Sequence, residues 1–203
     1  MPTRDLRQHL IDRLQPSLNA PRTLLRLDLP PAAAAHFSKL PMRPASVLVP
    51  LLDGTDGLEV LLTQRADNLR IHAGQISLPG GSCDAGDCDM IDTALREAEE
   101  ETCLQRRHVE VIGLLDDYPT GTGFRVTPVV GLVDPSAKLQ ADGIEATALL
   151  RVPLVYLLDP RHYRTGRFVR EGVELPFLEV TWQDWRIWGA TAGMLRNLCD
   201  KLA

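Results

Sequence analysis

The sequence has little lysine, few aromatic residues and no long hydrophobic run. Three lysines stand against 19 arginines, and aromatic residues make up 5% of the chain. No apolar run approaches the ~18–20 residues that a bilayer-spanning helix needs. The first ten residues, MPTRDLRQHL, lack the apolar segment of a secretory signal. We therefore expect a cytoplasmic protein with no membrane partner.

Cysteine is also scarce, and the four that occur do not follow a metal-ligand spacing. Reduced thiols are the simplest interpretation. The net charge of −5 provides no general attraction to nucleic acid. Arginine suits bidentate contact with phosphate, although codon usage is the simpler explanation for most of the arginines. We expect a small-molecule partner and no nucleic acid.

The length of 203 residues suits one domain with an N-terminal extension. Hydrophobic spacing predicts a helix over residues 3–15, and a proline-rich connector follows, so we assign residues 1–40 to the extension and 41–203 to the domain. Strands and helices alternate without regular βαβ order, which indicates an α+β fold. Strands are expected at 45–52, 58–65, 109–118 and 125–133, a strand or helix edge at 145–154, two strands around Glu171–Gly172, and a helix at 188–202.

The acids are concentrated in one segment, because residues 83–102 hold eight of the 27 acids and one base. A helix is predicted from about Asp89, which can cap its N-terminus, to Leu104. Its apolar stripe would pack on a core, and a second face carries Glu97, Glu100 and Glu101. Taken alone, a solvated face is the simpler interpretation of such a run. The alternative is a bound cation, for which clustered carboxylates suit Mg²⁺ or Mn²⁺.

Residues 96–104, REAEEETCL, resemble the second half of the Nudix box. The box has a Gly, five residues, a Glu, seven residues, Arg-Glu, an apolar residue, any residue, Glu-Glu, any residue, Gly and an apolar residue. The first half departs from it. Asp87 follows Gly81 by six positions in place of Glu, and one residue too many separates it from Arg96. Cys103 stands where the final Gly belongs.

A second motif precedes the box. Residues 61–81, LLTQRADNLRIHAGQISLPGG, resemble the signature of the coenzyme A pyrophosphatase branch of Nudix hydrolases. That signature reads Leu-Leu-Thr-x-Arg-Ser/Ala, three residues, Arg, three residues, Gly, three residues, Phe-Pro-Gly-Gly. Leu78 replaces the Phe, and the other fixed positions match. The resemblance covers about residues 45–200.

This resemblance implies a Nudix fold, an α/β/α sandwich with a mixed β-sheet. It implies metal-dependent hydrolysis of the diphosphate bond of coenzyme A or its thioesters, with Mg²⁺ or Mn²⁺ as cofactor. The products would be adenosine 3′,5′-bisphosphate and 4′-phosphopantetheine, or its acyl form. Glu97, Glu100 and Glu101 become the expected metal ligands, and Arg96 is expected to orient a box glutamate through an ion pair.

The resemblance also suggests roles outside the acidic helix. The general base would be a box glutamate or Glu145, for which an exposed carboxylate without a catalytic role is an equal alternative. The candidate substrate-binding residues each have a structural alternative, such as an arginine that clamps a neighbour or a glycine in a plain turn. They are Arg65, Arg70, Gly80, Gly81 and Phe124.

Two other functions stay open at this point. One is a Nudix hydrolase for another nucleotide, such as ADP-ribose, NADH or a damaged nucleoside triphosphate. The other is a non-catalytic domain that senses a nucleotide. The sequence leaves the oligomeric state open as well, with a homodimer among the alternatives.

Overall fold

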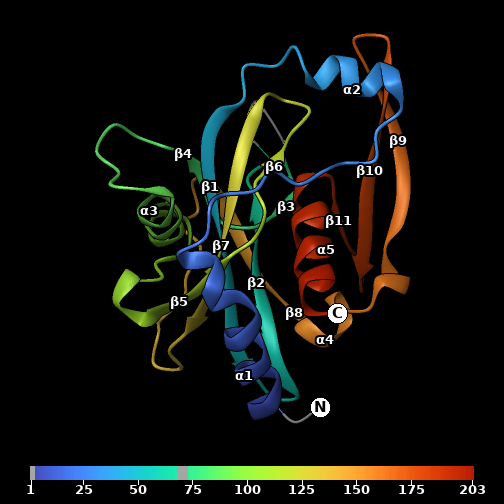
Figure 1. The fold of residues 1–203 in the computed structure, drawn as a ribbon. Helices are drawn as coiled ribbons and strands as arrows, with labels where there is room; N and C mark the ends of the chain where they lie inside the picture. The colour runs from blue at the N-terminus through green and yellow to red at the C-terminus, as the bar shows by residue number, and fades with distance from the viewer. Residues whose placement is uncertain (1–2, 68–72) are drawn as a thin grey trace.

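A mixed β-sheet forms the centre of the molecule (Figure 1). In a computed structural model, which describes residues 3–67 and 73–203, the main path of this sheet is β3–β2–β1–β7–β5. Strands β4, β6 and β8 pair with β1, β7 and β2. β1 runs parallel to β7, and the other pairings are antiparallel. The strands are β1 (Arg43–Gly54), β2 (Gly57–Arg65), β3 (Ile76–Ser77), β4 (Gly80–Ser82), β5 (Val109–Leu114), β6 (Tyr118–Pro119), β7 (Phe124–Val133) and β8 (Ala146–Pro153).

The central strand β1 is apolar on both of its faces. Leu48 and Leu52 belong to one buried cluster, while Val49 and Leu51 belong to the other. Successive strand side chains point to opposite faces, so this continuous apolar run requires a cover on each side.

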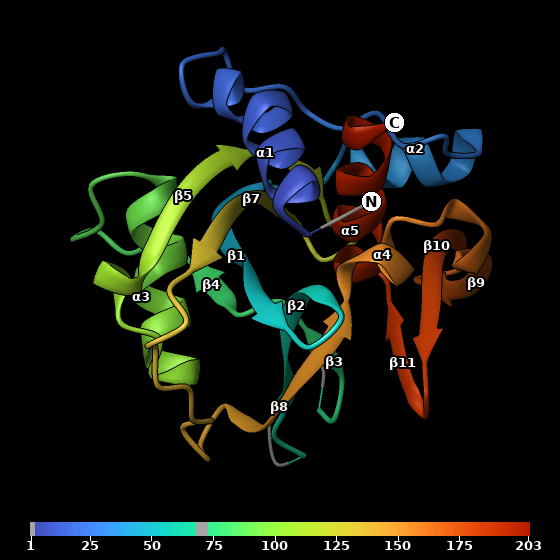
Figure 2. The same ribbon diagram turned by 90° about the horizontal axis from the view of Figure 1, so that it is seen from below.

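Helices provide these covers. α3 (Met90–Thr102) packs on the face of Leu48, and the other face is covered by α1 (Thr3–Leu14), α4 (Leu154–Leu157) and α5 (Ala190–Leu202). Figures 1 and 2 show α3 on one side of the sheet and α5 on the other. The expected α+β fold, with a mixed sheet between helices, is confirmed.

A second, three-stranded sheet lies beyond α5. It consists of β9 (Arg164–Arg170), β10 (Val173–Trp182) and β11 (Trp185–Trp188) in the order β11–β10–β9. The predicted turn at Glu171–Gly172 is present, with φ values of 52° and 76°. Sequence analysis did not predict β11, which is only four residues long.

The N-terminal segment packs closely against the rest of the chain. α1 inserts Leu6, Leu10 and Leu14 into the core, where they are 7%, 0% and 1% exposed. The connector contains one helix that was not predicted, α2 (Pro31–Phe37), which begins after Pro30. The division at residue 40 stays a prediction. The shorter 3₁₀ helices are η1 (Gln15–Leu18), η2 (Arg106–His108) and η3 (Pro160–His162).

The buried carboxylate of Asp117 holds the connector against the sheet. It accepts hydrogen bonds from Arg22, from Arg125 Nε at 2.7 Å and from Thr127 Oγ1 at 2.7 Å. The Asp117 backbone also donates to Thr23 O and accepts from Leu25 N, each at 2.8 Å. Multiple charged and neutral donors compensate for the burial of this charge.

The two ends of the described chain lie side by side (Figure 2). Arg13 donates to the carbonyl oxygens of Lys201 and Ala203 at 3.0 and 3.1 Å. His9 Nε2 lies 3.2 Å from Leu202 O. No helix in the described part of the chain combines the length and apolar character needed to cross a bilayer.

We predict that Leu10→Ala lowers the free energy of unfolding by about 2–5 kcal/mol, because it leaves a cavity under α1. Urea denaturation checks this value. The control is Leu24→Ala, which removes a side chain that is 51% exposed and is expected to change stability by no more than about 0.5 kcal/mol. Equal effects of the two substitutions would mean that α1 is not part of the core.

Candidate active site

Helix α3 places the acidic cluster against the sheet. Asp89 caps its N-terminus by accepting a hydrogen bond from Asp92 N at 2.8 Å. Ala94 and Ala98 are fully buried, so the helix backbone approaches the sheet closely. At the other end Cys103 adopts the left-handed conformation, with a φ of 56°. This is the position where the Nudix box has glycine, which adopts such a φ without strain.

Arg96 joins the loop before α3 to two glutamates of the helix. Its Nε and Nη2 donate to the two carboxylate oxygens of Asp87 at 2.8 and 2.9 Å. Its Nη1 lies 2.8 Å from Glu97 Oε1 and 3.4 Å from Glu100 Oε1. The Arg96 hydrogen bonds hold the pKa of Asp87 well below its usual range. Asp87 thus reaches Arg96 despite the altered spacing of the box.

The two glycines of the LPGG turn allow close approach of the backbone. A Cβ on Gly81 would lie 2.5 Å from the carboxyl carbon of Glu97. A Cβ on Gly80 would lie 2.4 Å from the carbonyl oxygen of Ser46. Both distances are shorter than van der Waals contact, so a larger residue at either position would displace β1 or the Glu97 carboxylate.

Glu101 is the most deeply buried carboxylate of the cluster, with 3% of the residue exposed. Thr63 Oγ1 donates to its Oε2 at 3.4 Å, and Arg65 Nη1 lies 3.8 Å from its Oε1. Burial raises the pKa of Glu101 to about 7, although the charge of Arg65 opposes this shift. Burial also raises the pKa of Glu97, against the hydrogen bond from Arg96.

The structure brings Glu145 to the same place from a distant loop. Its backbone carbonyl accepts from Ala66 N at 2.8 Å, and its Oε2 lies 3.8 Å from Arg65 Nη2. Arg65 therefore lies between the Glu101 and Glu145 carboxylates. The negative charge of Glu145 contributes to the raised pKa of both Glu97 and Glu101.

Glu99 and Phe124 contact side chains outside this cluster. Glu99 points elsewhere, with its Oε2 3.7 Å from Arg106 Nε. The ring of Phe124 is covered by the guanidinium of Arg43, whose Cζ is 4.2 Å from the ring centroid. Arg70 lies outside the described residues. Sequence analysis missed Thr63 as a partner of Glu101, although Thr63 is a fixed position of the second motif.

The donor chemistry of the cluster suits a divalent cation. Carboxylate oxygens are the ligands that Mg²⁺ and Mn²⁺ prefer, and Glu97, Glu100 and Glu101 provide them. Within the described residues, Glu101 Oε1 is buried without a hydrogen bond. No three His, Cys, Asp or Glu side chains of residues 3–67 and 73–203 are gathered closely enough to hold a metal. Binding a cation would therefore require the glutamate carboxylates to move closer together than they lie in this structure.

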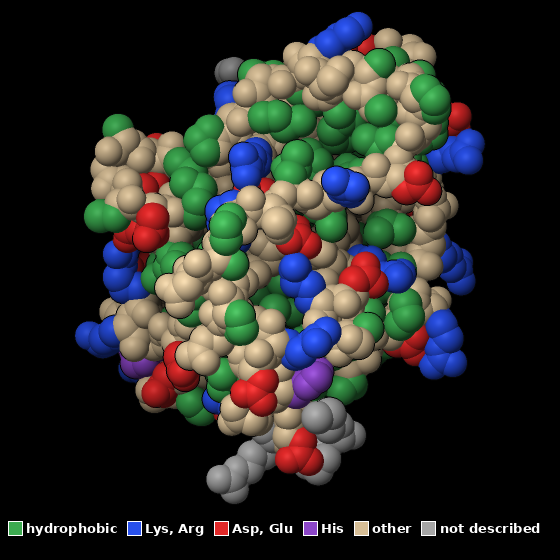
Figure 3. Space-filling view, viewed as in Figure 1, with side chains coloured by type: hydrophobic (Ala, Val, Ile, Leu, Met, Phe, Trp, Pro, Cys, Tyr) green, Lys and Arg blue, Asp and Glu red, His purple; other side chains and the backbone are tan. Residues whose placement is uncertain are grey.

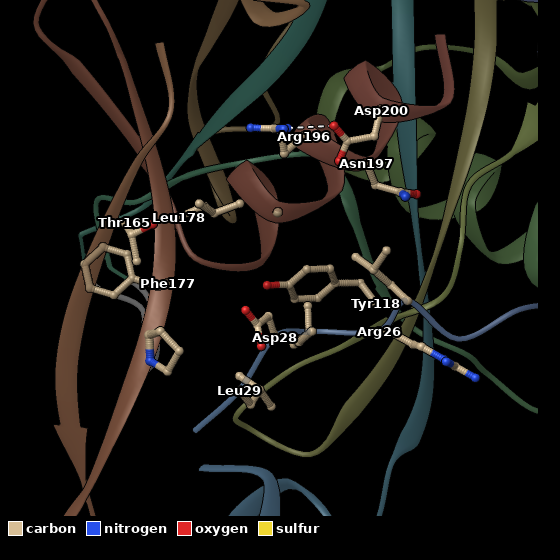
Figure 4. Close-up of a pocket in the computed structure, with 14 residues that line it drawn as sticks. Arg26, Asp28, Leu29, Tyr118, Thr165, Phe177, Leu178, Arg196, Asn197 and Asp200 are labelled. Atoms are coloured by element: carbon tan, nitrogen blue, oxygen red, sulfur yellow. Dashed lines mark hydrogen bonds and ion pairs between the residues drawn. The ribbon is translucent and has the colours of Figure 1, made fainter. Parts of the chain in front are cut away.

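A cavity of about 220 Å³ opens beside Arg65 and Gly80. A larger cavity of about 390 Å³ lies away from the glutamates, between α5, β10 and residues 25–29. Figure 4 shows Tyr118 pointing into it, near the Arg196–Asp200 ion pair. On the face drawn in Figure 3, basic and acidic side chains are interspersed, and hydrophobic side chains gather above, over the region of α2.

Comparison with known proteins identifies the family. The model of the NUDIX domain family matches residues 42–162. The chain belongs to this family. It is 35% identical over 193 residues to "Uncharacterized Nudix hydrolase NudL" of Yersinia pestis strain Pestoides F. The aligned region covers 95% of this chain and 93% of that relative. The protein of the same name in Yersinia pseudotuberculosis serotype O:1b has the same identity and coverage.

Among solved structures, the crystal structure of a C. elegans Ap4A hydrolase binary complex is similar to 56% of this chain and 82% of that chain. Its identity is 19% and its TM-score is 0.45. The chain is a Nudix hydrolase. Its activity is the one general to this family, pyrophosphohydrolysis of small nucleotide-diphosphate substrates. Nudix enzymes typically use a divalent metal.

The raised pKa of Glu101 predicts a pH-dependent effect of Glu101→Gln on the stability of the metal-free protein. Its pKa is about 7 in the folded chain against an ordinary value of 4.5. Below the pKa of the unfolded chain, Glu101 is protonated in both states and its burial costs little free energy. As pH rises through 7, the unfolded chain loses this proton more readily than the folded chain, so the free energy of unfolding falls. Glutamine cannot ionise, so its burial never involves a charge. The free energy of unfolding of the variant, relative to that of the wild type, therefore rises by roughly 1–3 kcal/mol between pH 5 and pH 9. Denaturation in EDTA at both pH values measures this gain, and a pH-independent difference would contradict the shift.

Proposed function

We propose that this Nudix hydrolase cleaves the diphosphate of coenzyme A or its thioesters. Water adds across the P–O–P anhydride, one bridging P–O bond breaks, and the products are adenosine 3′,5′-bisphosphate and 4′-phosphopantetheine or its acyl form. The enzyme class follows from the family. The substrate is our inference from the residues that surround the acidic cluster.

One observation carries the substrate assignment. The segment that resembles the coenzyme A signature forms a wall of the acidic cluster. Thr63 contacts Glu101, Arg65 lies between Glu101 and Glu145, and the Gly81 backbone approaches Glu97. Residues that resemble a substrate signature thus lie within reach of the groups proposed to carry the reaction.

Glu97, Glu100 and Glu101 would hold Mg²⁺ or Mn²⁺. When bound, such a cation supplies charge neutralisation at the phosphoryl oxygens and lowers the pKa of bound water. Asp87 retains Arg96 through its two short hydrogen bonds. Arg96 consequently stays beside Glu97 as a positioning residue if the glutamate turns toward a cation.

A carboxylate must also accept the proton of the attacking water. Two groups meet this requirement on the same side of the site. One is a glutamate of the acidic helix whose carboxylate is not engaged by the cation. The Glu145 side chain is 54% exposed and also faces Arg65, so it can exchange its proton with solvent.

Arg65 is the proposed contact for the substrate diphosphate. Its Nε is buried without a hydrogen bond to another described residue, and its Nη groups lie 3.8 Å from two carboxylates. Such contacts are long for charged hydrogen bonds. A phosphate oxygen could therefore bind without breaking a short ion pair.

We predict that Glu101→Gln lowers turnover by two orders of magnitude or more, because it removes a buried, charged ligand. Steady-state rates at saturating Mg²⁺ or Mn²⁺ test this. Glu99→Gln is the matched control from the same helix, since Glu99 faces Arg106, and its rate should change by less than about twofold. Comparable losses in both variants would contradict the assignment of the helix face.

Substrate identity is tested by mass analysis of the products. The wild-type protein is incubated with coenzyme A, dephospho-coenzyme A, ADP-ribose and NADH, each with Mn²⁺ and each with EDTA. We expect metal-dependent release of 4′-phosphopantetheine from coenzyme A to be the fastest cleavage. Faster cleavage of ADP-ribose or NADH would retain the metal site and overturn the substrate. A lack of cleavage in all samples would favour a nucleotide-sensing domain.

A further inference from the structure

The cavity beside Arg65 is built from apolar side chains of several elements. β1, β7, α5 and β11 contribute Val47, Val126, Met194 and Trp188, and the segment before Gly80 contributes Ile76 and Leu78. Val47 and Val126 lie on the face of the sheet that α5 covers, opposite α3. The cavity and the acidic helix are therefore on opposite faces of one sheet, and Arg65 and Gly80 belong to the boundary between them.

The described lining of this cavity carries little charge. Of the described residues that line it, Arg65 alone is charged. Arg65 Nε is buried and has no hydrogen-bond partner among the described residues. An apolar pocket with a few oriented polar groups is the usual form of a small-molecule site. This one offers the Arg65 guanidinium, the uncharged polar groups of Gln75, Ser77 and Thr191, and otherwise mainly apolar walls.

The walls suit a flexible uncharged chain better than a nucleoside. Among the described residues of the lining Trp188 is the aromatic one, but its ring centroid is 5.2 Å from that of Phe177 and 5.4 Å from Arg186 Cζ. The ring is thus engaged in an existing cluster. No carboxylate from the described lining is present to accept ribose hydroxyl groups.

We propose that this cavity binds the uncharged arm attached to the substrate diphosphate, and that it selects substrates by this arm. The proposal rests on the proposed function, in which the arm is pantetheine. Arg65 then marks the junction, with the scissile diphosphate toward α3 and the arm between the sheet and α5. The nucleotide half lies outside this cavity.

The test is a substitution in α5 that places a larger side chain in the wall of the cavity. Ala190 is half-buried and lines the cavity, so Ala190→Leu adds three carbons inside it. Calorimetry in EDTA measures the binding of 4′-phosphopantetheine, pantetheine and adenosine 3′,5′-bisphosphate. We expect the first two to bind about tenfold more weakly, because the added carbons occupy space that the arm would fill. Adenosine 3′,5′-bisphosphate should retain its affinity within about twofold.

Thr165→Leu is the matched control, since Thr165 lines the larger cavity in Figure 4 and not this one. It should leave all three affinities unchanged. If Ala190→Leu fails to fold, Ala190→Val repeats the test with a smaller side chain. Selective loss of adenosine 3′,5′-bisphosphate, or equal loss of all three ligands, would overturn the proposal.

The same experiment separates this inference from the proposed function. If the wild type releases 4′-phosphopantetheine from coenzyme A but Ala190→Leu shows no selective loss of the arm, the substrate stands and the cavity assignment fails. If the wild type binds neither pantetheine compound and does not cleave coenzyme A, the proposed function is overturned, and the cavity assignment is overturned with it. Tight binding of pantetheine without cleavage would retain the cavity and overturn the reaction.

Discussion

The buried carboxylate of Glu101, whose ion pair with the described part of the chain is 3.8 Å long, is the constraint on which this site depends. Desolvating an anion is costly unless charge and hydrogen bonds compensate for it. Here Thr63 at 3.4 Å, Arg65 at 3.8 Å and a backbone hydrogen bond from Gly80 compensate for it only in part, because burial still raises the pKa of Glu101. The packing of α3 through Ala94 and Ala98 must hold the carboxylate in place. The structure thus uses packing energy to keep a reactive group ready for a charged partner.

Two arginines near this carboxylate make contacts of different length. Arg96 makes short contacts with Asp87 and Glu97 and fixes the loop to the helix. Arg65 makes long contacts with Glu101 and Glu145, and its Nε has no hydrogen-bond partner among the described residues. A short bidentate pair is a rigid structural element, whereas long contacts leave a cation available to a ligand. The difference in distance supports a positioning role for Arg96 and a binding role for Arg65.

Local patterns predicted the parts of the molecule that depend on nearby residues. The acidic helix, its Asp89 cap and the separate direction of Glu99 follow from helical periodicity. The convergence of Thr63, Glu101 and Glu145 could not be read in this way, because strand pairing sets it across long stretches of chain. Asp87 departs from the motif in residue type and in spacing, yet its carboxylate accepts a hydrogen bond from Arg96. The second sheet was missed in part because β11 is too short to show periodicity.

The contact between α1 and α5 has a consequence for the way the chain is made. Synthesis proceeds from the N-terminus, and segments fold as they leave the ribosome. α1 is synthesised before its partners Lys201 and Leu202, because the contacting residues are separated by 188 and 193 positions along the chain. Its three buried leucines therefore lack part of their final cover until α5 has been made. The nascent chain must carry this exposed apolar helix until α5 arrives, which makes α1 a candidate segment for chaperone contact.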